Sequence, residues 1–240
     1  MHTQPVIHHK GVIFMKRIGI IGAMPSELKD IQGVQENAVT KEIAGYSFYE
    51  SRHGENEIVT ACCGIGKVNA ALCTQIMIDC FHVDCIINTG IAGGMHGDVK
   101  LCDIVVSTSV LPHDLDAHFL ADYPPYCAVY DADEALQALA KAVCRDMNIP
   151  VHSGKIVSGD AFITDSAVKA GIKAKFDPYA VDMETAAIGQ AAWRNKVPFV
   201  SVRCISDLAD DDGAMSFDQF EIIAAKRVAD IVMEMCAREV

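Results

Sequence analysis

Acidic side chains follow three apolar stretches of this 240-residue chain. Asp182 and Glu184 come after one stretch, Asp207 ends a second, and Glu27 follows a third, Ile18-Gly19-Ile20-Ile21. A carboxylate at the end of a buried stretch costs free energy unless it is paired or takes part in chemistry. The pattern therefore predicts an acid/base site where strands of an α/β scaffold end.

The elements that must position these acids alternate along the chain. Short apolar runs predict strands over 17–21, 47–51, 57–62, 85–89, 103–110, 154–158, 180–183 and 199–205. Helices are predicted over 24–30, 66–80, 132–147, 165–174, 184–193 and 216–236. Strands separated by helices indicate a sheet covered on both faces, with ligand sites beyond the carboxyl ends of its strands. We expect one domain over 16–240, preceded by a flexible extension over 1–15.

Composition narrows the class of protein. Apolar residues make up 51% of the chain, which is enough for a large core, and the formal net charge is −12. This charge disfavours nucleic acid or an anionic membrane as the main partner, and no apolar run reaches transmembrane length. The ten cysteines form no C-x-x-C pair, and we expect a reducing, cytoplasmic compartment.

Two glycine-rich stretches follow candidate strands. Gly64-Ile65-Gly66-Lys67-Val68-Asn69-Ala70 has Asn69 where a dinucleotide fingerprint needs a third glycine, and Ala61 where a P-loop needs its first. A tight strand-to-helix turn is the favoured interpretation. For Asn88-Thr89-Gly90-Ile91-Ala92-Gly93-Gly94 two interpretations stay open: a loop whose N–H groups face a ligand oxygen, and a loop that only needs positive φ.

A third stretch, Ser158-Gly159-Asp160-Ala161-Phe162-Ile163, follows another candidate strand. Phe162 could pack on a flat ring and the backbone of Ile163 could bind a base edge, although a single Phe is more often part of a core. The acidic run 210–212 lacks EF-hand spacing and predicts a solvated loop. The nine histidines show no metal-binding spacing, so we expect no metal.

Six motifs in this order resemble those of the nucleoside phosphorylase/nucleosidase superfamily. The resemblance runs from about residue 16 to the C-terminus, and six motifs in register are far more specific than any one of them. The motifs are Ile18-Gly19-Ile20-Ile21-Gly22-Ala23-Met24-Pro25-Ser26-Glu27, Gly64-Ile65-Gly66-Lys67-Val68, Asn88-Thr89-Gly90-Ile91-Ala92-Gly93-Gly94, Ser158-Gly159-Asp160-Ala161-Phe162-Ile163, Asp182-Met183-Glu184-Thr185-Ala186-Ala187 and Ile205-Ser206-Asp207.

The resemblance implies a three-layer α/β/α fold whose central mixed sheet is partly curled into a barrel. It also implies hydrolysis of the N-glycosidic bond of 5′-substituted adenosines, namely 5′-methylthioadenosine, S-adenosylhomocysteine and 5′-deoxyadenosine, in methionine salvage and S-adenosylmethionine recycling. Water is the expected nucleophile, with no metal or organic cofactor. Glu27 stands near the first strand, where phosphorylases place phosphate-binding groups, and this favours water over phosphate.

The resemblance further assigns roles to the acids. Asp207 would donate a proton to adenine N7, for which burial must raise its pKa, and Glu27 would deprotonate the attacking water. Glu184 would bind the ribose hydroxyls and stabilise the cationic sugar. Arg203 would orient the water or Glu184, or hold Glu184 in an ion pair. The other expected substrate-binding residues are Met24 and Met183 at the sugar, Phe162 and Ile163 at adenine, Ser206 beside the acid, and Ile65, Gly93 and Phe217.

Two departures from the superfamily pattern leave alternatives open. Ile91 stands where some relatives carry a small hydroxyl residue near the water, and the segment 113–125 diverges from the expected loop. In relatives this loop reaches the neighbouring subunit's site, so the resemblance implies a homodimer and leaves the 5′ substituent open. The alternatives are an aminodeoxyfutalosine nucleosidase of menaquinone synthesis, a nucleoside phosphorylase and a non-catalytic nucleoside-binding protein.

Overall fold

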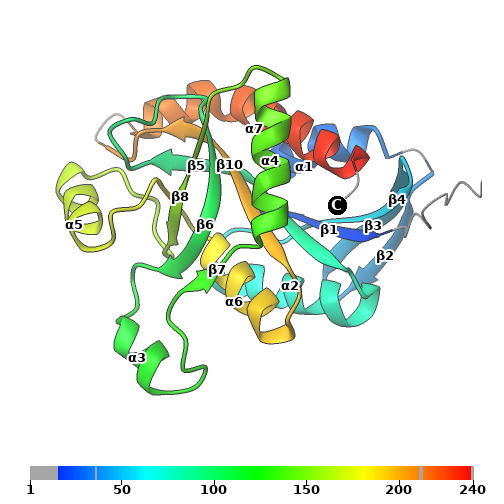
Figure 1. The fold of residues 1–240 in the computed structure, drawn as a ribbon, viewed down its shortest axis with the longest axis horizontal. Coiled ribbons are helices and arrows are strands. Elements are labelled where there is room, and N and C mark those ends of the chain that lie inside the picture. The colour runs from blue at the N-terminus through cyan, green and yellow to red at the C-terminus, as the bar shows by residue number, and fades with distance from the viewer. Residues whose placement is uncertain (1–15, 36, 211–212, 239–240) are drawn as a thin grey trace, which may run out of the picture.

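The structure is a computed structural model that describes residues 16–35, 37–210 and 213–238. Figure 1 shows its elements. The strands are β1 (Arg17–Gly22), β2 (Val39–Ile43), β3 (Tyr46–His53), β4 (Asn56–Cys62), β5 (Cys85–Gly94), β6 (Ile104–Pro112), β7 (Tyr130–Asp131), β8 (Val151–Ser158), β9 (Ala180–Asp182) and β10 (Phe199–Asp207). The helices are α1 (Pro25–Gly33), α2 (Lys67–Phe81), α3 (Ala117–Asp122), α4 (Glu134–Asp146), α5 (Ser166–Phe176), α6 (Thr185–Asn195) and α7 (Gly213–Ala237).

Five strands of the central sheet close into a barrel. They pair in the order β10-β6-β8-β9-β5, and an additional pairing between β10 and β5 completes the ring. The sheet continues from β5 through β1, β4, β3 and β2 as an open, twisted extension. The sheet contains both parallel pairs, such as β1–β5 and β5–β10, and antiparallel pairs, such as β6–β10. The predicted mixed, partly barrel-like sheet is therefore confirmed.

Helices cover both faces of this sheet. Helices α1, α4 and α7 pack on one side, and α2 and α6 pack together on the other (Figure 1). Helix α3 lies in the segment that connects β6 to β7, and this segment projects away from the body of the molecule (Figure 1). The architecture is the predicted three-layer α/β/α arrangement, with the barrel at one end of the middle layer.

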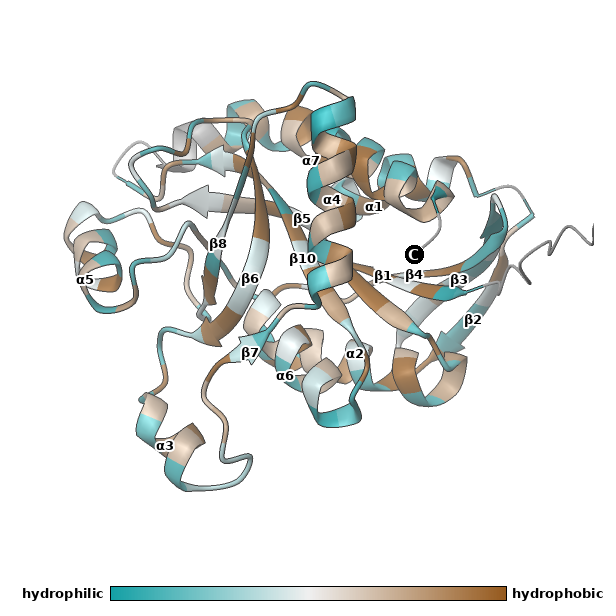
Figure 2. Ribbon diagram, viewed as in Figure 1, coloured by the Kyte–Doolittle hydropathy of each residue, from teal (hydrophilic) through white to brown (hydrophobic). Residues whose placement is uncertain are grey.

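The core lies in the middle layer because its central strands are apolar on both faces. Every residue of β5 and of β10 is buried, as expected for strands covered by helices on each side. In Figure 2 the central strands are largely brown, whereas teal gathers on the outer turns of the helices and on β2 and β3. Buried polar side chains within such strands are costly, so those of β5 and β10 mark a candidate functional site.

Three elements differ from the sequence-based expectation. Strands β2 and β7 and helix α3 have no predicted counterpart, because β2 is nearly all exposed and polar and the other two are short. The stretch from Asn88 to Gly94, expected as a loop, continues strand β5 instead. Residues 1–15, expected as an extension, and 211–212 of the acidic run lie outside the described residues. Within the described part of the chain, no helix is long and apolar enough to cross a membrane.

Candidate active site

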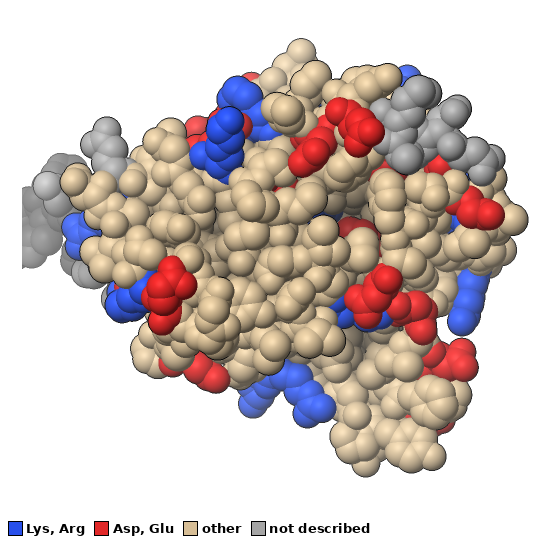
Figure 3. Space-filling view, turned by 180° about the vertical axis from the view of Figure 1, so that it is seen from behind, with Lys and Arg blue, Asp and Glu red and all other residues tan. Residues whose placement is uncertain are grey.

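A cavity of about 300 Å³ opens at the carboxyl ends of β1, β5 and β10. Figure 3 shows the molecule from the back of Figure 1, with a hollow on this face and acidic atoms in its depth. Strands β1, β5 and β10 are parallel neighbours, so the segments that leave their carboxyl ends meet at one edge of the sheet. The lining residues are Ala23, Met24, Glu27, Ile65, Ile91, Ala92, Gly93, Phe162, Val181, Asp182, Met183, Glu184, Ser206, Asp207 and Phe217.

Glu27 lies in the first turn of α1 and closes that turn with its own side chain. Its Oε2 accepts hydrogen bonds from the N–H groups of Ala23 at 2.6 Å and Met24 at 2.9 Å, and its Oε1 accepts one from Ile91 at 2.9 Å. The residue is only 2% exposed. Burial raises the pKa of Glu27, while Arg203 and the three N–H donors oppose that rise. Glu27 is thus a held carboxylate at the cavity wall that can still gain a proton.

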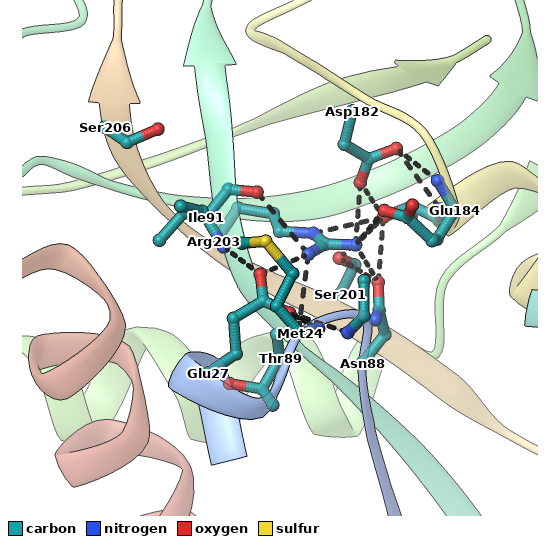
Figure 4. A network of polar contacts seen from close by, with 12 residues as sticks. Met24, Glu27, Asn88, Thr89, Ile91, Asp182, Glu184, Ser201, Arg203 and Ser206 are labelled. Atoms are coloured by element: carbon teal, nitrogen blue, oxygen red, sulfur yellow. Dashed lines mark hydrogen bonds and ion pairs between the residues drawn. The ribbon is translucent and has the colours of Figure 1, made fainter. Parts of the chain in front are cut away.

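Arg203 lies in the middle of β10 and is fully buried behind the cavity. Figure 4 shows its guanidinium group between Glu27 on one side and Asp182 and Glu184 on the other. The distances from its Nη atoms are 2.9 Å to Asp182 Oδ2, 3.8 Å to Glu27 Oε1 and 3.9 Å to Glu184 Oε2. Arg203 therefore does not line the cavity, and it acts on the acids that do.

Gly90 makes the approach of Glu27 to Arg203 possible. It has φ +146°, and a Cβ atom there would overlap both the Glu27 carboxylate and the Arg203 guanidinium. Any other residue would therefore separate the two groups or strain the backbone. The sequence leaves two interpretations of the stretch from Asn88 to Gly94 open. The N–H of Ile91 does face an oxygen, as the first interpretation expects, but this oxygen belongs to Glu27 and not to a ligand.

Glu184 occupies the N-cap position of α6. The helix begins at the next residue, one later than the sequence predicts. Its Oε1 accepts a hydrogen bond from the N–H of Gly66 at 2.8 Å. Burial, followed by the charge of Asp182, raises the pKa of Glu184 to about 7, and Arg203 opposes the rise. The stretch Gly64–Ala70, interpreted as a tight turn, is thus a turn that also binds this acid.

Asp207 is the last residue of β10, and it also lines the cavity. Its Oδ2 accepts a hydrogen bond from Ser206 Oγ at 2.9 Å, and its Oδ1 accepts one from the N–H of Ala209 at 2.8 Å. Burial raises the pKa of Asp207, and these two donors oppose the rise. Among the described residues no cationic group lies at hydrogen-bond distance from Asp207, so burial lets it keep a proton to higher pH than an exposed aspartate would.

The remaining wall of the cavity is apolar. Phe162 and Phe217 meet edge to face with ring centroids 5.4 Å apart, and Phe162 is half exposed at the rim. Met24, Met183, Ile65 and Gly93 also belong to this wall. Such a surface suits a flat, weakly polar ring system next to a polar floor.

Two predicted residues lie behind the wall. Arg203 does so because its whole side chain is buried, and the Ile163 side chain belongs to a small core cluster and contacts only an adjoining cavity of about 20 Å³. The other ten predicted residues all line the main cavity. Sequence reasoning assigned no role to Asp182, although its position two residues before Glu184 in an apolar run was a usable signal.

Comparison with known proteins defines the class of this chain. The sequence profile of the Phosphorylase superfamily matches residues 17–237, which include every element of the fold and every residue of the cavity. Together with the barrel and the acids at its strand ends, this match establishes the phosphorylase superfamily as the class.

Particular relatives narrow the class further. A 5′-methylthioadenosine/S-adenosylhomocysteine nucleosidase of Exiguobacterium sp. is 42% identical over 228 residues, which are 92% of this chain and 98% of that protein. The structure of the nucleosidase of that name from Neisseria meningitidis, in complex with methylthio-immucillin-A, has a TM-score of 0.89 at 37% identity and covers 93% of this chain and 99% of that one. A Helicobacter pylori futalosine hydrolase mutant has a TM-score of 0.86 at 31% identity and covers 92% and 98%. The chain belongs to the 5′-methylthioadenosine/S-adenosylhomocysteine nucleosidase family of this superfamily.

Proposed function

We propose that the chain hydrolyses the N-glycosidic bond of 5′-methylthioadenosine and S-adenosylhomocysteine, and also of 5′-deoxyadenosine. The products are adenine and the 5′-substituted ribose, as methionine salvage requires. The observation that carries this proposal is the placement of Glu27, Glu184 and Asp207 around one apolar-walled cavity. The family to which the chain belongs supports the same activity.

The chemistry is dictated by the charges that form as the bond breaks. The ribose gains oxocarbenium character and the adenine gains negative charge, so the site must stabilise both ends. Burial raises the pKa of Asp207, so Asp207 is the acid that donates a proton to adenine N7 and improves the leaving group. Glu184, which lines the same cavity, binds the ribose hydroxyls and stabilises the cationic sugar.

Water supplies the nucleophile at Glu27. This carboxylate is held by three backbone N–H donors, so it stays in one position as it takes the proton of the attacking water. Burial raises its pKa and makes it a stronger base than an exposed glutamate. Ile91 offers the water no hydroxyl group, so Glu27 is its main partner here. The expectation that no metal or organic cofactor takes part stays a prediction.

The apolar wall binds the uncharged parts of the substrate. Phe162 packs on the adenine ring with Phe217 behind it, and Met24 and Met183 contact the sugar. Ser206 holds the Asp207 carboxyl group at 2.9 Å. Ile163 contributes through its backbone, because its side chain belongs to the core.

A phosphate-dependent reaction is the weaker alternative. Among the described residues that line the cavity there is no Lys, Arg or His, and the buried Arg203 is already surrounded by three acids. A phosphate dianion beside Glu27 would meet like charge. These contacts favour hydrolysis over phosphorolysis.

The test is release of free adenine in phosphate-free buffer. The purified chain is incubated separately with methylthioadenosine, S-adenosylhomocysteine, 5′-deoxyadenosine and aminodeoxyfutalosine, with the Glu27→Gln variant as the matched control. Adenine release that the variant lacks supports the proposal. Release only from aminodeoxyfutalosine would favour the futalosine hydrolase alternative, which the similar Helicobacter pylori fold motivates. Turnover that requires added phosphate would overturn hydrolysis, and a bound but intact nucleoside would indicate a binding protein.

We further propose a homodimer in which the 113–125 segment lies near the neighbouring site. Phe119, Tyr123 and Tyr126, in and just after α3, are each at least half exposed although they are aromatic. A groove beside them, between α2 and α6, is lined by Val68, Leu115 and other residues. A second copy of the chain is the partner that would cover both surfaces. Sedimentation analysis of Phe119→Asp should then give a monomer, whereas Ile222→Asp on exposed α7 should not.

The expected compartment is the cytoplasm. All ten cysteines lie within the described ranges and are free thiols, which suits a reducing environment.

A further inference from the structure

Asp182 has no part in the proposed reaction, yet it is the acid most tightly bound in the site. It ends strand β9 and is almost fully buried between Arg203 and the first turn of α6. Figure 4 shows it on the far side of the guanidinium group from Glu27. A buried carboxylate in this position requires a physical reason.

Every partner of the Asp182 carboxylate is a hydrogen-bond donor. Oδ1 accepts from Ser158 Oγ at 2.5 Å and from the N–H groups of Glu184 and Thr185, each at 3.2 Å. Oδ2 accepts from Arg203 Nη2 at 2.9 Å and from the hydroxyl of Thr185. An amide in this place would turn one donor toward other donors. The surroundings are therefore built for a carboxylate.

The contact with Arg203 decides how its positive charge is shared. Asp182 is 2.9 Å from the guanidinium, against 3.8 Å for Glu27 and 3.9 Å for Glu184. A fully buried cation must be paired, and the closest acid takes the largest share. If Asp182 were absent, Arg203 would have only the two acids on which the proposed reaction depends.

The contacts with α6 fix the position of Glu184. The Glu184 side chain does not cap the helix whose N-cap position it occupies. Asp182 instead accepts from the N–H groups of Glu184 and Thr185. Ser158, which donates to Asp182, accepts from the N–H of the residue that follows Thr185. The Glu184 carboxylate thus stays free to face the cavity and the N–H of Gly66.

Resting on the proposed hydrolysis, we propose that Asp182 is a positioning residue: it pairs with Arg203 and holds the start of α6, and so leaves Glu27 and Glu184 free to act on water and ribose. In this role Asp182 contacts neither the attacking water nor the ribose. Its effect passes through the charge of Arg203 and the place of Glu184.

The ionisation of Glu184 reports this role directly. The groups that face it are Asp182 from β9, Arg203 from β10, Glu27 from α1 and Cys63 after β4. The negative charge of Asp182 raises the pKa of Glu184, and Arg203 lowers it. Removing the charge of Asp182 takes away the first effect and frees Arg203 for Glu184, so both changes lower the pKa. Loss of packing around Asp182 without loss of its charge would not lower the pKa in this way.

The experiment compares the wild-type chain with Asp182→Asn. Glutamate labelled with ¹³C at Cδ is followed by NMR against pH, and the Glu184 signal is identified by its loss in Glu184→Gln. We expect Glu184 of the Asn variant to titrate at lower pH than in the wild type. We also expect kcat for methylthioadenosine to fall on the order of 100-fold, as displaced catalytic groups cause, with a smaller change in KM.

Two further variants keep the test decisive. Asp182→Glu retains the charge, so Glu184 should titrate near its wild-type pH, while the altered geometry lowers kcat. If Glu184 titrates at lower pH in this variant, the proposal is overturned, even where the Asn variant does not fold. Asp103→Asn, which removes another buried acid paired with His152 at 3.0 Å, should change neither measurement. An unchanged Glu184 titration in a folded Asp182→Asn protein refutes the role. A wild-type chain that releases no adenine refutes the hydrolysis alone, because the NMR titration needs no turnover.

Discussion

Replacing Gly90 with alanine tests the geometry of the site at its narrowest point. The new Cβ would enter the space between the Glu27 carboxylate and the Arg203 guanidinium, where it overlaps both. The backbone at φ +146° also suits glycine and few other residues. One methyl group is therefore expected to damage stability and catalysis together.

The two effects have separate magnitudes. Holding a non-glycine residue in this backbone region costs about 1–3 kcal/mol, which for a chain of this size lowers Tm by about 2–12 °C. The displaced Glu27 can no longer hold the attacking water in line, and loss of a positioned general base lowers kcat by about 100- to 10,000-fold. Thermal unfolding and adenine release, both on the purified variant, measure the two effects.

Gly171 offers a matched control with the opposite expectation. It lies within helix α5, and a Cβ there meets nothing within 4 Å. Gly171→Ala should therefore stabilise the chain by about 0.5–1 kcal/mol, because alanine favours a helix over glycine, and should leave kcat unchanged. A Gly90→Ala protein with wild-type Tm and kcat would refute the reasoning, since Glu27 and Arg203 would then not need that space.

The other predictions concern Asp207, the pH dependence of kcat/KM and Phe162. Asp207→Asn cannot protonate adenine N7, so kcat should fall about 100- to 10,000-fold while calorimetry still detects methylthioadenosine binding. The plot of kcat/KM against pH should be bell-shaped. The rate rises as Glu184, with a pKa of about 7, and the base Glu27, whose pKa burial also raises, ionise. It falls where Asp207 loses the proton that burial helps it keep. Phe162→Ala removes base stacking worth about 1–3 kcal/mol, so KM should rise about 5- to 150-fold with little change in kcat.

The sequence was sufficient to place together the three acids that we propose take part in the reaction. Glu27, Glu184 and Asp207 each follow an apolar stretch, and strand ends of an α/β sheet meet at one edge. The resemblance of the six motifs to a known superfamily added the layer architecture and the barrel, and the structure has both. The positions of the acids follow from local apolar pattern, which a single sequence contains, whereas the barrel was expected only from that resemblance.

Contacts between distant strands could not be predicted in the same way. The role of Asp182 depends on the register that sets it opposite Ser158 and on Arg203 of another strand lying beside it. The same limit explains Ile163, whose side chain turns into the core, and Gly90, expected in a loop but found in β5. A one-residue change of register would move the Asp182 and Arg203 side chains to the other faces of their strands.

The strand that closes the barrel is also the last strand to leave the ribosome. β10 lies between β5 and β6, which precede it by about a hundred residues. Until β10 is in place, β5 and β6 each present an unpaired edge, the kind of surface that recruits other chains into aggregates. Arg203 and Asp207 arrive with the same strand. Completion of the active site and protection of these edges are therefore one folding event, and chains cut short before residue 199 would lack both.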